Sequence, residues 1–376
     1  MPPSTSPSPR DASPDSALSE TTAPGPVSSL NPNLRRQASG AKALLSVDAY
    51  VRGIRRGDRV VLSRAITLLE STKPAHQQRA RTVLDRCVPE AGDSLRIGIT
   101  GVPGVGKSTF IEALGTRLAD DGRRIAVLAI DPSSERSKGS ILGDKTRMGA
   151  LASHDNVYIR PSPTSGSLGG VARTTRETIL LCEAAGFDTI FVETVGVGQS
   201  EITVHSMVDL FLLLALAGAG DELQGIKRGI MEMADAIVIN KADGENKRAA
   251  QRARQNYRNA LHLFPPTDSG WSPPVLTCSA QTGHRIDAVW EMMLDYRDHV
   301  QHSGHFQQRR TEQAHYWMQQ TIEQRLLRDF FDDARVQEHL PDLKQQVLAG
   351  TLSAFAAADR LLDAYRSPGA EAGEGA

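Results

Sequence analysis

The sequence contains few cysteines, and no two of them lie close together. Cys87, Cys182 and Cys278 are the only three in 376 residues, and no pair has CxxC spacing. Neither a disulfide framework nor a zinc site built of thiolates is therefore expected. Long apolar runs are also missing, because the longest, residues 210–217, is far shorter than the ~20 residues that cross a bilayer. We expect no membrane segment.

The chain also lacks an excess of charge of either sign. It carries 43 Lys and Arg against 44 Asp and Glu, a formal net charge of −1. Because a basic excess is what attracts proteins to phosphate backbones, we expect no nucleic acid as a partner. The first 20 residues have no hydrophobic stretch and include acidic residues, unlike secretion or organelle-targeting signals. These features favour a cytoplasmic protein.

The composition divides the chain into five segments. Residues 1–40 hold 8 of the 20 prolines and no aromatic residue, so this segment cannot bury enough apolar surface to fold. We predict a disordered tail there and another at residues 367–376. Apolar residues recur at helical spacing over residues 45–90, where Gly57 and Asp58 separate two helices. Helical spacing returns over residues 286–366.

Residues 91–285 alternate short apolar runs with helical stretches. This pattern is typical of an α/β fold in which helices cover both faces of a mostly parallel sheet. We expect strands at Arg96–Thr100, Ile125–Ile130, Thr189–Val192, Leu210–Ala215, Ala236–Ile239 and Val275–Thr277.

The first of these strands runs into a glycine-rich loop and then a helix. The loop matches the phosphate-binding pattern GxxxxGK[ST], which requires this strand–loop–helix context. Its glycines let backbone N–H groups surround phosphate oxygens, Lys107 would reach the β- and γ-phosphates, and the Ser108 hydroxyl would bind Mg²⁺. The expected phosphate-binding residues are Gly101, Val102, Pro103, Gly104, Val105, Gly106, Lys107, Ser108 and Thr109.

Acidic residues follow two further strands at the same edge of the expected sheet. Asp131 and Asp144 flank a polar loop after the second strand, and Glu193 ends another strand three residues before Gly196. Carboxylates at the carboxyl ends of parallel strands face the ligand crevice. We therefore expect Asp131, Asp144 and Glu193 to serve the metal and the attacking water, although the two aspartates could also act in turns and helix caps.

Two later strands end in residues suited to recognising guanine. In Asn240-Lys241-Ala242-Asp243, the Asp243 carboxylate can accept from guanine N1–H and N2–H₂, a pair of donors that adenine does not present. Asn240 can bond the base or a neighbouring loop, and the Lys241 stem can stack on the base. After the last strand, we expect Ser279, Ala280 and Gln281 to complete the guanine site, with the Ala280 N–H facing O6.

Two other groups of residues have a simpler interpretation. His299, His302 and His305 are three apart, but no carboxylate or cysteine pattern accompanies them, so a solvated cluster is the expected reading. The aromatic residues of the C-terminal segment are interpreted as helix-packing or interface residues rather than a platform for stacking bases. They are Trp290, Tyr296, Tyr316, Trp317, Phe330 and Phe331.

Over residues 45–365, these motifs resemble the MeaB-type GTPases, which include proteins associated with methylmalonyl-CoA mutase and were once named ArgK. The residues that carry the resemblance are GVPGVGKST, AIDPSS, GSILGDKTRM, FVETVGVGQSE, AGAGDELQGIKRGIMEMAD and NKAD. The resemblance implies a P-loop GTPase domain with helical extensions on both sides, and a homodimer formed through residues 286–366. It also implies a partner, a cobalamin-dependent acyl-CoA mutase, whose adenosylcobalamin loading is gated and which is protected from inactivation.

The resemblance further implies Mg²⁺ as cofactor, GTP and GDP as substrate and product, and a partner-sensing switch at residues 218–227. One departure is Lys138, where relatives carry glycine in the switch loop. Three alternatives stay open: a nickel-insertion GTPase for hydrogenase or urease maturation, a small-molecule kinase, and a purely structural nucleotide-binding module. The first lacks Cys and His ligands beside the phosphate loops, and NKAD argues against the ATP site of a kinase.

Overall fold

The computed structural model describes residues 44–130, 148–161, 168–194, 200–217 and 228–367. The chain divides into two units, Met1–Leu45 and Ser46–Ala376, and the helices and strands described lie in the second. The tail predicted at residues 1–40 lies outside the described residues, as does the tail at 367–376 except for Ser367.

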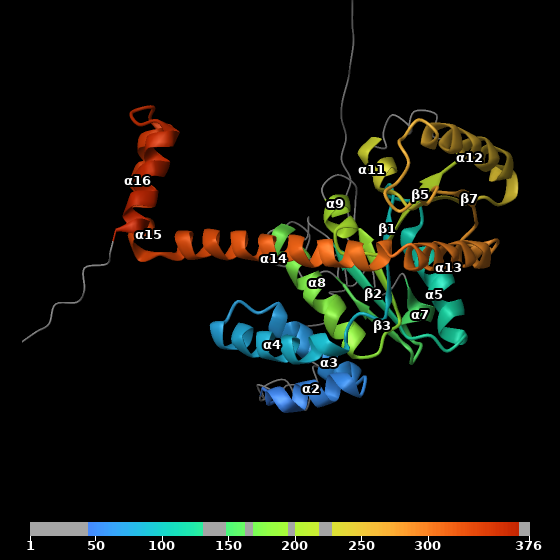
Figure 1. Cartoon of the computed structure of the whole chain (residues 1–376), viewed down its shortest axis with the longest axis horizontal. Coiled ribbons are helices and arrows are strands. Elements are labelled where there is room, and N and C mark those ends of the chain that lie inside the picture. The colour runs from blue at the N-terminus through green and yellow to red at the C-terminus, as the bar shows by residue number, and fades with distance from the viewer. Residues whose placement is uncertain (1–43, 131–147, 162–167, 195–199, 218–227, 368–376) are drawn as a thin grey trace, which may run out of the picture. The chain divides into compact units, whose positions relative to one another are not determined.

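Seven strands form one sheet, and every pair of neighbouring strands is parallel (Figure 1). Their order is β3-β2-β4-β1-β5-β6-β7. Strands β1, β2, β4 and β6 are buried along their whole length, as expected where helices cover both faces. The strands are β1 Leu95–Thr100, β2 Ile125–Ile130, β3 Val157–Arg160, β4 Thr189–Thr194, β5 Leu210–Leu216, β6 Ala236–Asn240 and β7 Val275–Thr277.

The six strands expected from the sequence are confirmed, some with one or two more residues. Strand β3, with the sequence VYIR, was not expected. It is an edge strand of four residues whose one partner among the described strands is β2, and its last two residues are only partly buried. A run this short and mixed gives no clear strand pattern, because the signal of a buried strand is a longer apolar run.

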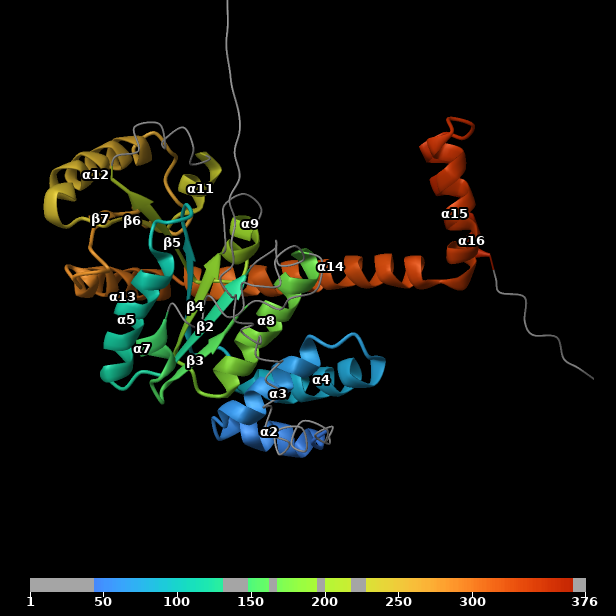
Figure 2. The same ribbon diagram turned by 180° about the vertical axis from the view of Figure 1, so that it is seen from behind.

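Helices cover both faces of the sheet (Figures 1 and 2). On one face lie α5 (Lys107–Asp120), α7 (Gly149–Ala152) and α13 (Ile286–His302), which bury Phe110 and Met293 against the sheet. On the other lie α8 (Leu168–Ala184) and the short α9 (Ser200–His205). The core is therefore built between the sheet and these two helical layers.

Three helices precede the sheet, as the sequence predicted. They are α2 (Val47–Arg55), α3 (Arg59–Leu69) and α4 (Pro74–Cys87), followed by the short η1 (Val88–Glu90), and they pack on one another and on α8. Asp58 caps α3, since its carboxylate accepts from the N–H groups of Val60 and Val61 at 2.9 and 3.1 Å.

Helices also follow the sheet, as predicted for the C-terminal segment. After α13 come α14 (His305–Asp332), α15 (Ala334–Leu348) and α16 (Ala354–Arg366), the last two packing through their own apolar cluster. The division of this unit into domains at residues 90 and 285 stays a prediction, although an element ends or begins at each point.

A buried cluster of ion pairs ties α14 to the amino-terminal edge of the sheet. The Arg310 guanidinium donates to both carboxylate oxygens of Asp209 at 2.8 and 2.7 Å, and to the Ser94 carbonyl at 2.6 Å. Beside it, Arg96 donates to both oxygens of Glu183 at 2.8 Å each. All four charged side chains are at least nine-tenths buried. Because a buried charge without a partner is strongly destabilising, the folded state depends on these pairs.

The histidines and aromatic residues of this region serve packing and hydrogen bonding. His299 Nε2 lies 2.9 Å from the Ser269 carbonyl, and Trp317 Nε1 donates to the Ser206 carbonyl at 3.0 Å. Tyr296 is buried in the core, whereas Tyr316 and Phe331 are exposed. The packing interpretation of the aromatic residues is therefore confirmed for Trp317 and Tyr296.

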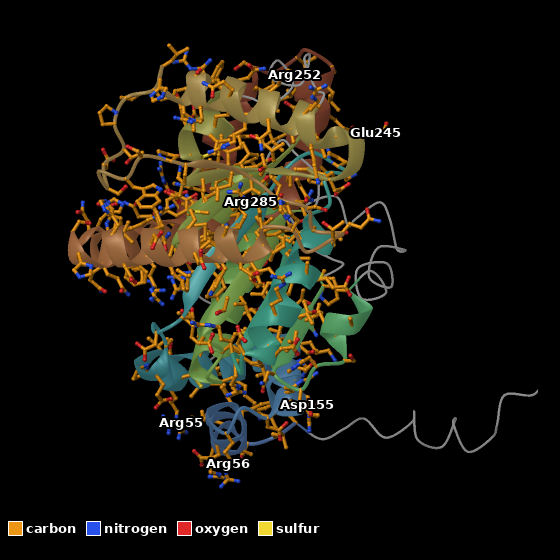
Figure 3. The ribbon with its side chains drawn as sticks, turned by 90° about the vertical axis from the view of Figure 1, so that its right-hand side faces the viewer. Arg55, Arg56, Asp155, Glu245, Arg252 and Arg285 are labelled. Carbon is orange, nitrogen blue, oxygen red and sulfur yellow. The ribbon has the colours of Figure 1, made fainter. Side chains whose placement is uncertain are left out.

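The remaining elements flank strands β5 to β7. They are α11 (Arg228–Met233), η2 (Gly244–Asn246) and α12 (Lys247–Leu261). Helix α12 carries exposed charged side chains, among them Arg252, which Figure 3 labels together with Glu245 of η2. Across the described residues, no helix is long and apolar enough to cross a membrane.

Candidate functional site

The loop between β1 and α5 has the backbone conformation that a phosphate-binding loop needs. Gly101 has a φ of 151°, and a Cβ there would lie 2.4 Å from the Leu214 carbonyl oxygen. Gly106 has a φ of 94°, and a Cβ there would lie 2.9 Å from Asn240 Nδ2. Glycine is therefore required at both positions, because a side chain would strain the backbone and meet strands β5 and β6.

Lys107 begins α5 and lies beneath this loop. Its Nζ donates to the Gly101 carbonyl at 2.8 Å, and the residue is 8% exposed. Burial lowers the pKa of Lys107, while the charges of Glu193 and Glu201 oppose that shift. The lysine ammonium group is thus held against the backbone of the loop, and the charges of two carboxylates act on it. Phosphate oxygens are its expected ligands.

Ser108 and Glu193 meet although they are 85 residues apart. The Ser108 hydroxyl donates to Glu193 Oε1 at 3.1 Å, and next to them Thr194 Oγ1 donates to Thr100 Oγ1 at 3.1 Å. Adjacent oxygen ligands of an octahedral Mg²⁺ lie about 2.9 Å apart, and hydroxyl and carboxylate oxygens are the donors this ion prefers. The residues present therefore fit Mg²⁺ at the end of β4.

The expected base-binding residues lie beside the phosphate loop and brace it. Asn240 Nδ2 donates to the Val105 carbonyl at 2.9 Å, and its Oδ1 accepts from the Ala280 N–H at 3.0 Å. Lys241 Nζ donates to the Gly104 carbonyl at 2.8 Å. Of the two roles considered for Asn240, the structure shows the contact to a neighbouring loop. It also shows the Ala280 N–H bonded to Asn240, where the sequence reading placed it against guanine O6.

Asp243 is positioned by the loop that follows β7. The Ser279 hydroxyl donates to Asp243 Oδ2 and itself accepts from the Thr282 N–H at 3.2 Å. Ser279 is buried, whereas Gln281 is exposed. One Asp243 oxygen is held by this contact, so the carboxylate is fixed in direction and its other oxygen can accept from a ligand.

Several predicted residues lie outside the described residues. Asp131 is the residue after β2 in the sequence, but neither it nor Asp144 is described. Gly196, Lys138 and the switch loop at 218–227 also fall there. The structure therefore brings Lys107, Ser108 and Glu193 together at one place, and Asn240, Asp243 and Ser279 at the adjacent place.

Glu201 was missed by the sequence reading. It lies in the first turn of α9, is 3% exposed and is one of the two carboxylates whose charge acts on Lys107. Its only signal was its position eight residues after Glu193, within the segment FVETVGVGQSE. That spacing alone does not indicate whether Glu201 belongs to the site or caps a helix.

These observations define the class of the protein first. A parallel sheet, a glycine loop before a helix, a buried lysine, a Ser–Glu pair and an Asp held beside the loop are the parts of a P-loop nucleotide hydrolase. The family model described as "Methylmalonyl Co-A mutase-associated GTPase MeaB" matches residues 62–335. The chain belongs to this family and is a GTPase, which confirms the family resemblance and the fold class.

Named relatives agree with that assignment. The GTPase ArgK of Escherichia coli is 49% identical over 281 residues, covering 75% of this chain and 85% of its own. The methylmalonic aciduria type A homolog, mitochondrial, of Mus musculus is 45% identical over 331 residues, covering 85% of this chain and 80% of its own. A crystal structure titled LAO/AO transport system kinase is similar with a TM-score of 0.65 and 38% identity, covering 85% of this chain and 99% of its own.

Proposed function

We propose that this GTPase assists a cobalamin-dependent acyl-CoA mutase, methylmalonyl-CoA mutase in the first place. Its nucleotide state would gate the loading of adenosylcobalamin and protect the mutase from inactivation. The observation that carries the proposal is the family match over residues 62–335, because the family is described by its association with that mutase. The name of the mouse relative, which refers to methylmalonic aciduria, supports it.

Within the site, we assign roles residue by residue. The loop Gly101 to Thr109 holds the phosphates, Lys107 neutralises charge at the β- and γ-phosphates, and Asp243 with Ser279 to Gln281 holds guanine. Ser108, Glu193, Asp131 and Asp144 hold the metal and orient the attacking water. Mg²⁺ bound by these oxygens would offset the negative charge that develops on the phosphates.

Two variants test the hydrolytic site. Lys107→Ala is expected to abolish turnover, and Glu193→Gln to lower kcat at least tenfold with a smaller effect on GTP affinity, since its carboxylate serves the reaction more than binding. Asp121→Asn, an exposed carboxylate at the C-terminal end of α5, is the matched control. Single-turnover hydrolysis and GDP binding measured together separate the two effects, and normal kcat in both variants would reject the assigned roles.

No observation favours the nickel alternative. Among the described residues there is no group of three or more His, Cys, Asp or Glu side chains that could hold a metal ion. Cys182 and Cys278 are buried, and burial raises the pKa of both thiols, that of Cys278 to about 12. Thiols held protonated in the core are poor metal ligands.

The mutase proposal is tested by titrating purified acyl-CoA mutases into the GTPase. Methylmalonyl-CoA mutase is expected to raise the hydrolysis rate, because a GTPase speeds up when a partner orders its switch loops and positions a second cation, beside the P-loop lysine, on the γ-phosphate. Arg228, exposed where α11 begins after residues 218–227, is one candidate cation. Transfer of adenosylcobalamin is followed in parallel, and a mutase that changes neither quantity would overturn the proposal. We propose that the protein is cytoplasmic and binds the mutase there.

A further inference from the structure

Glu201 is a buried carboxylate that has no role in the site as assigned so far. It lies in the first turn of α9, is 3% exposed, and its charge acts on the Lys107 ammonium group. Glutamate is rarely buried this completely, because an ionised carboxylate loses its hydration inside a protein. A carboxylate this near the phosphate loop also repels phosphates, so its presence there calls for a function.

The other carboxylate that acts on Lys107 is engaged with a different group. Glu193 Oε1 accepts from the Ser108 hydroxyl at 3.1 Å, and we have assigned both residues to the metal. Glu201 comes from a separate element, the helix α9, and is assigned to no ligand. It is therefore the carboxylate that is left to act on the lysine itself.

Helix α9 lies close against strand β1, which leads into the phosphate loop. A Cβ added to Gly98, in the middle of β1, would lie 2.8 Å from Val204 Cγ1 of α9. Glycine is therefore required at this position of the strand, since a side chain would push the helix away. Val204 follows Glu201 by three residues, so the two side chains share one face of α9. The face of α9 that packs on the sheet thus also carries Glu201.

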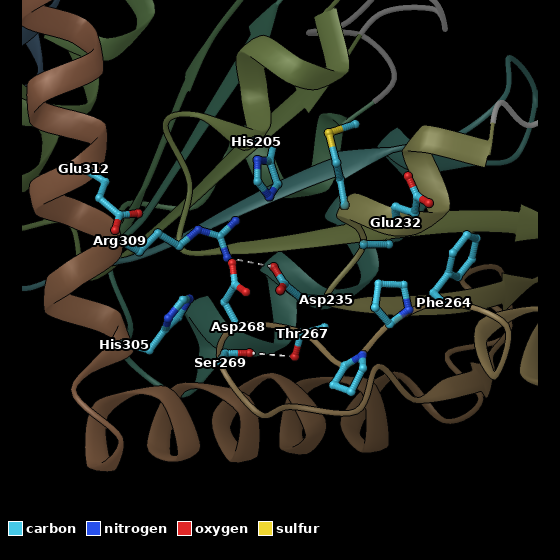
Figure 4. A pocket seen from close by; sticks show the side chains of 14 residues that line it. His205, Glu232, Asp235, Phe264, Thr267, Asp268, Ser269, His305, Arg309 and Glu312 are labelled. Carbon is cyan, nitrogen blue, oxygen red and sulfur yellow. Dashed lines mark hydrogen bonds and ion pairs between the residues drawn. The ribbon is translucent and has the colours of Figure 1, made fainter.

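The other end of α9 is fixed by α14 and β5. Trp317 Nε1 donates to the Ser206 carbonyl at 3.0 Å, and the His205 ring meets the Phe211 ring edge to face, with ring centroids 5.7 Å apart. Figure 4 shows His205 in the pocket that it lines together with Arg309. A helix of six residues that is held in its middle and at its end has little freedom to tilt, so Glu201 has a defined position.

We propose that Glu201 is a positioning residue of the GTPase reaction, whose carboxylate keeps the Lys107 ammonium group in place in the phosphate loop. Lysine is a flexible side chain with three donors, and one donor goes to the Gly101 carbonyl at 2.8 Å. Attraction to Glu201 limits the remaining positions that the ammonium group can take. A cation fixed in advance stabilises the charge that develops on the phosphates during hydrolysis, without being reorganised at that moment. The inference rests on the phosphate-binding role proposed for Lys107.

A simpler role for Glu201 makes a different prediction. A carboxylate in the first turn of a helix interacts favourably with the positive end of the helix dipole. If this were its whole contribution, replacing Glu201 would lower stability and leave kcat of the folded protein unchanged.

Kinetics of Glu201→Gln separate the two roles, because glutamine keeps the size of the side chain and removes its charge. We expect kcat to fall by about tenfold or more, and the GDP dissociation constant to change by less than about threefold. Asp48→Asn, which removes an exposed carboxylate from the first turn of α2, is the matched control and should keep both values. An unchanged kcat, or a GDP affinity that falls as much as kcat, overturns the positioning role.

Glu201→Asp provides the same measurement if the glutamine variant does not fold. Aspartate keeps the charge but withdraws it by one methylene group from the place where Glu201 holds it. We expect kcat to fall by about threefold or more with GDP affinity nearly unchanged. A kcat equal to that of the wild type would contradict a role that depends on position.

A double-mutant cycle tests whether Glu201 acts through Lys107. Urea unfolding gives midpoints for the wild type, Glu201→Gln, Lys107→Ala and the double variant. We expect Glu201→Gln to lower the midpoint of the wild type, and to lower it by at most about half as much, or to raise it, in the Lys107→Ala protein. Equal shifts in the two backgrounds are what a charge at a helix start produces, and they overturn the proposal.

Turnover of Lys107→Ala is measured in the same series. If that variant hydrolyses GTP normally, the role proposed for Lys107 fails, and this inference fails with it. If Lys107→Ala is inactive while Glu201→Gln keeps a normal kcat, the proposed site stands and only the positioning role of Glu201 is wrong.

Discussion

The Asp243 carboxylate has one oxygen held by Ser279 and one left for a ligand. Replacing it by an amide exchanges an acceptor for a donor, which suits the 2-oxo group of xanthine and not the 2-amino group of guanine. We expect Asp243→Asn to weaken GTP binding by about a hundredfold, because the charge-assisted contact to guanine is lost, and to improve binding of xanthosine triphosphate.

Competition binding with GTP, ATP and xanthosine triphosphate measures this change of specificity. Glu245→Gln, an exposed carboxylate two residues away on η2, is the control and should leave the order of affinities as it is. A wild-type protein that prefers ATP would contradict the guanine assignment.

His205 makes stability depend on pH. Its pKa is lowered from 6.5 to about 4 in the folded chain by burial and by Arg309, with Asp235, Glu232 and His305 also lining its pocket. The folded state therefore keeps the ring neutral while the unfolded state takes up a proton below pH 6.5. The stabilisation is fully present above pH 6.5 and is lost as the pH falls toward 4, by on the order of 2–3 kcal/mol.

Urea unfolding at pH values from 7.5 to 4.5 measures that loss. His205→Gln should flatten the curve in this window, and His315→Gln, exposed on α14, supplies the matched control. Curves of the same slope for wild type and His205→Gln would rule out His205 as the cause.

At the scale of elements, the sequence predicted what local patterns encode. Gly57 and Asp58 marked the start of α3, and the apolar runs marked six strands, because burial on both faces demands continuous apolar residues. The motif residues Lys107, Ser108, Asn240 and Asp243 were found because their spacing is tied to a strand, a turn and a helix. Strand β3 was missed because it is a four-residue edge strand.

Long-range pairing of charges was not predictable in the same way. Arg96 and Arg310 are single charged residues within a strand pattern and a helical pattern, and their partners Glu183 and Asp209 are 87 and 101 residues away. The sequence carries no spacing that relates them. Only the packing of α8 and α14 against the amino-terminal edge of the sheet brings these four charges together.

Arg310 of α14 pairs with Asp209 at the edge of the sheet, so replacing it should lower the free energy of unfolding substantially. Arg310→Ala leaves Asp209 buried without its guanidinium and frees the Ser94 carbonyl, and we expect a loss of about 3–5 kcal/mol in the free energy of unfolding. Arg297→Ala removes a surface pair with Asp298 on the preceding helix and should change stability by about 1 kcal/mol or less. Chemical denaturation of both variants measures the difference; similar losses would show that the buried cluster contributes no more than a surface pair.

At the scale of the whole molecule, the part of the chain that the structure describes leaves apolar side chains of α14 exposed. The buried residues of α14 are Arg310, Gln313 and Trp317, all in its first half. Beyond them, Met318, Ile322 and Leu326 follow one another at four-residue intervals and are 54%, 50% and 61% exposed. Residues four apart share one face of a helix, so these three form an exposed apolar stripe. A contiguous apolar stripe in contact with water is typical of a surface that binds a partner.

We propose that this stripe is the contact between two copies of the chain, in keeping with the dimer expected for residues 286–366. A charge placed in it would be buried without a partner on both copies, which opposes association strongly. We expect Ile322→Glu with Leu326→Glu to raise the dissociation constant of the dimer at least a hundredfold. Gln307→Glu, exposed on the same helix before the stripe, adds a charge outside it and should leave the dimer intact. Sedimentation equilibrium of the three proteins gives the masses, with circular dichroism to verify folding. A wild-type chain that sediments as a monomer, or a double variant that remains a dimer, would show that the stripe is not the interface.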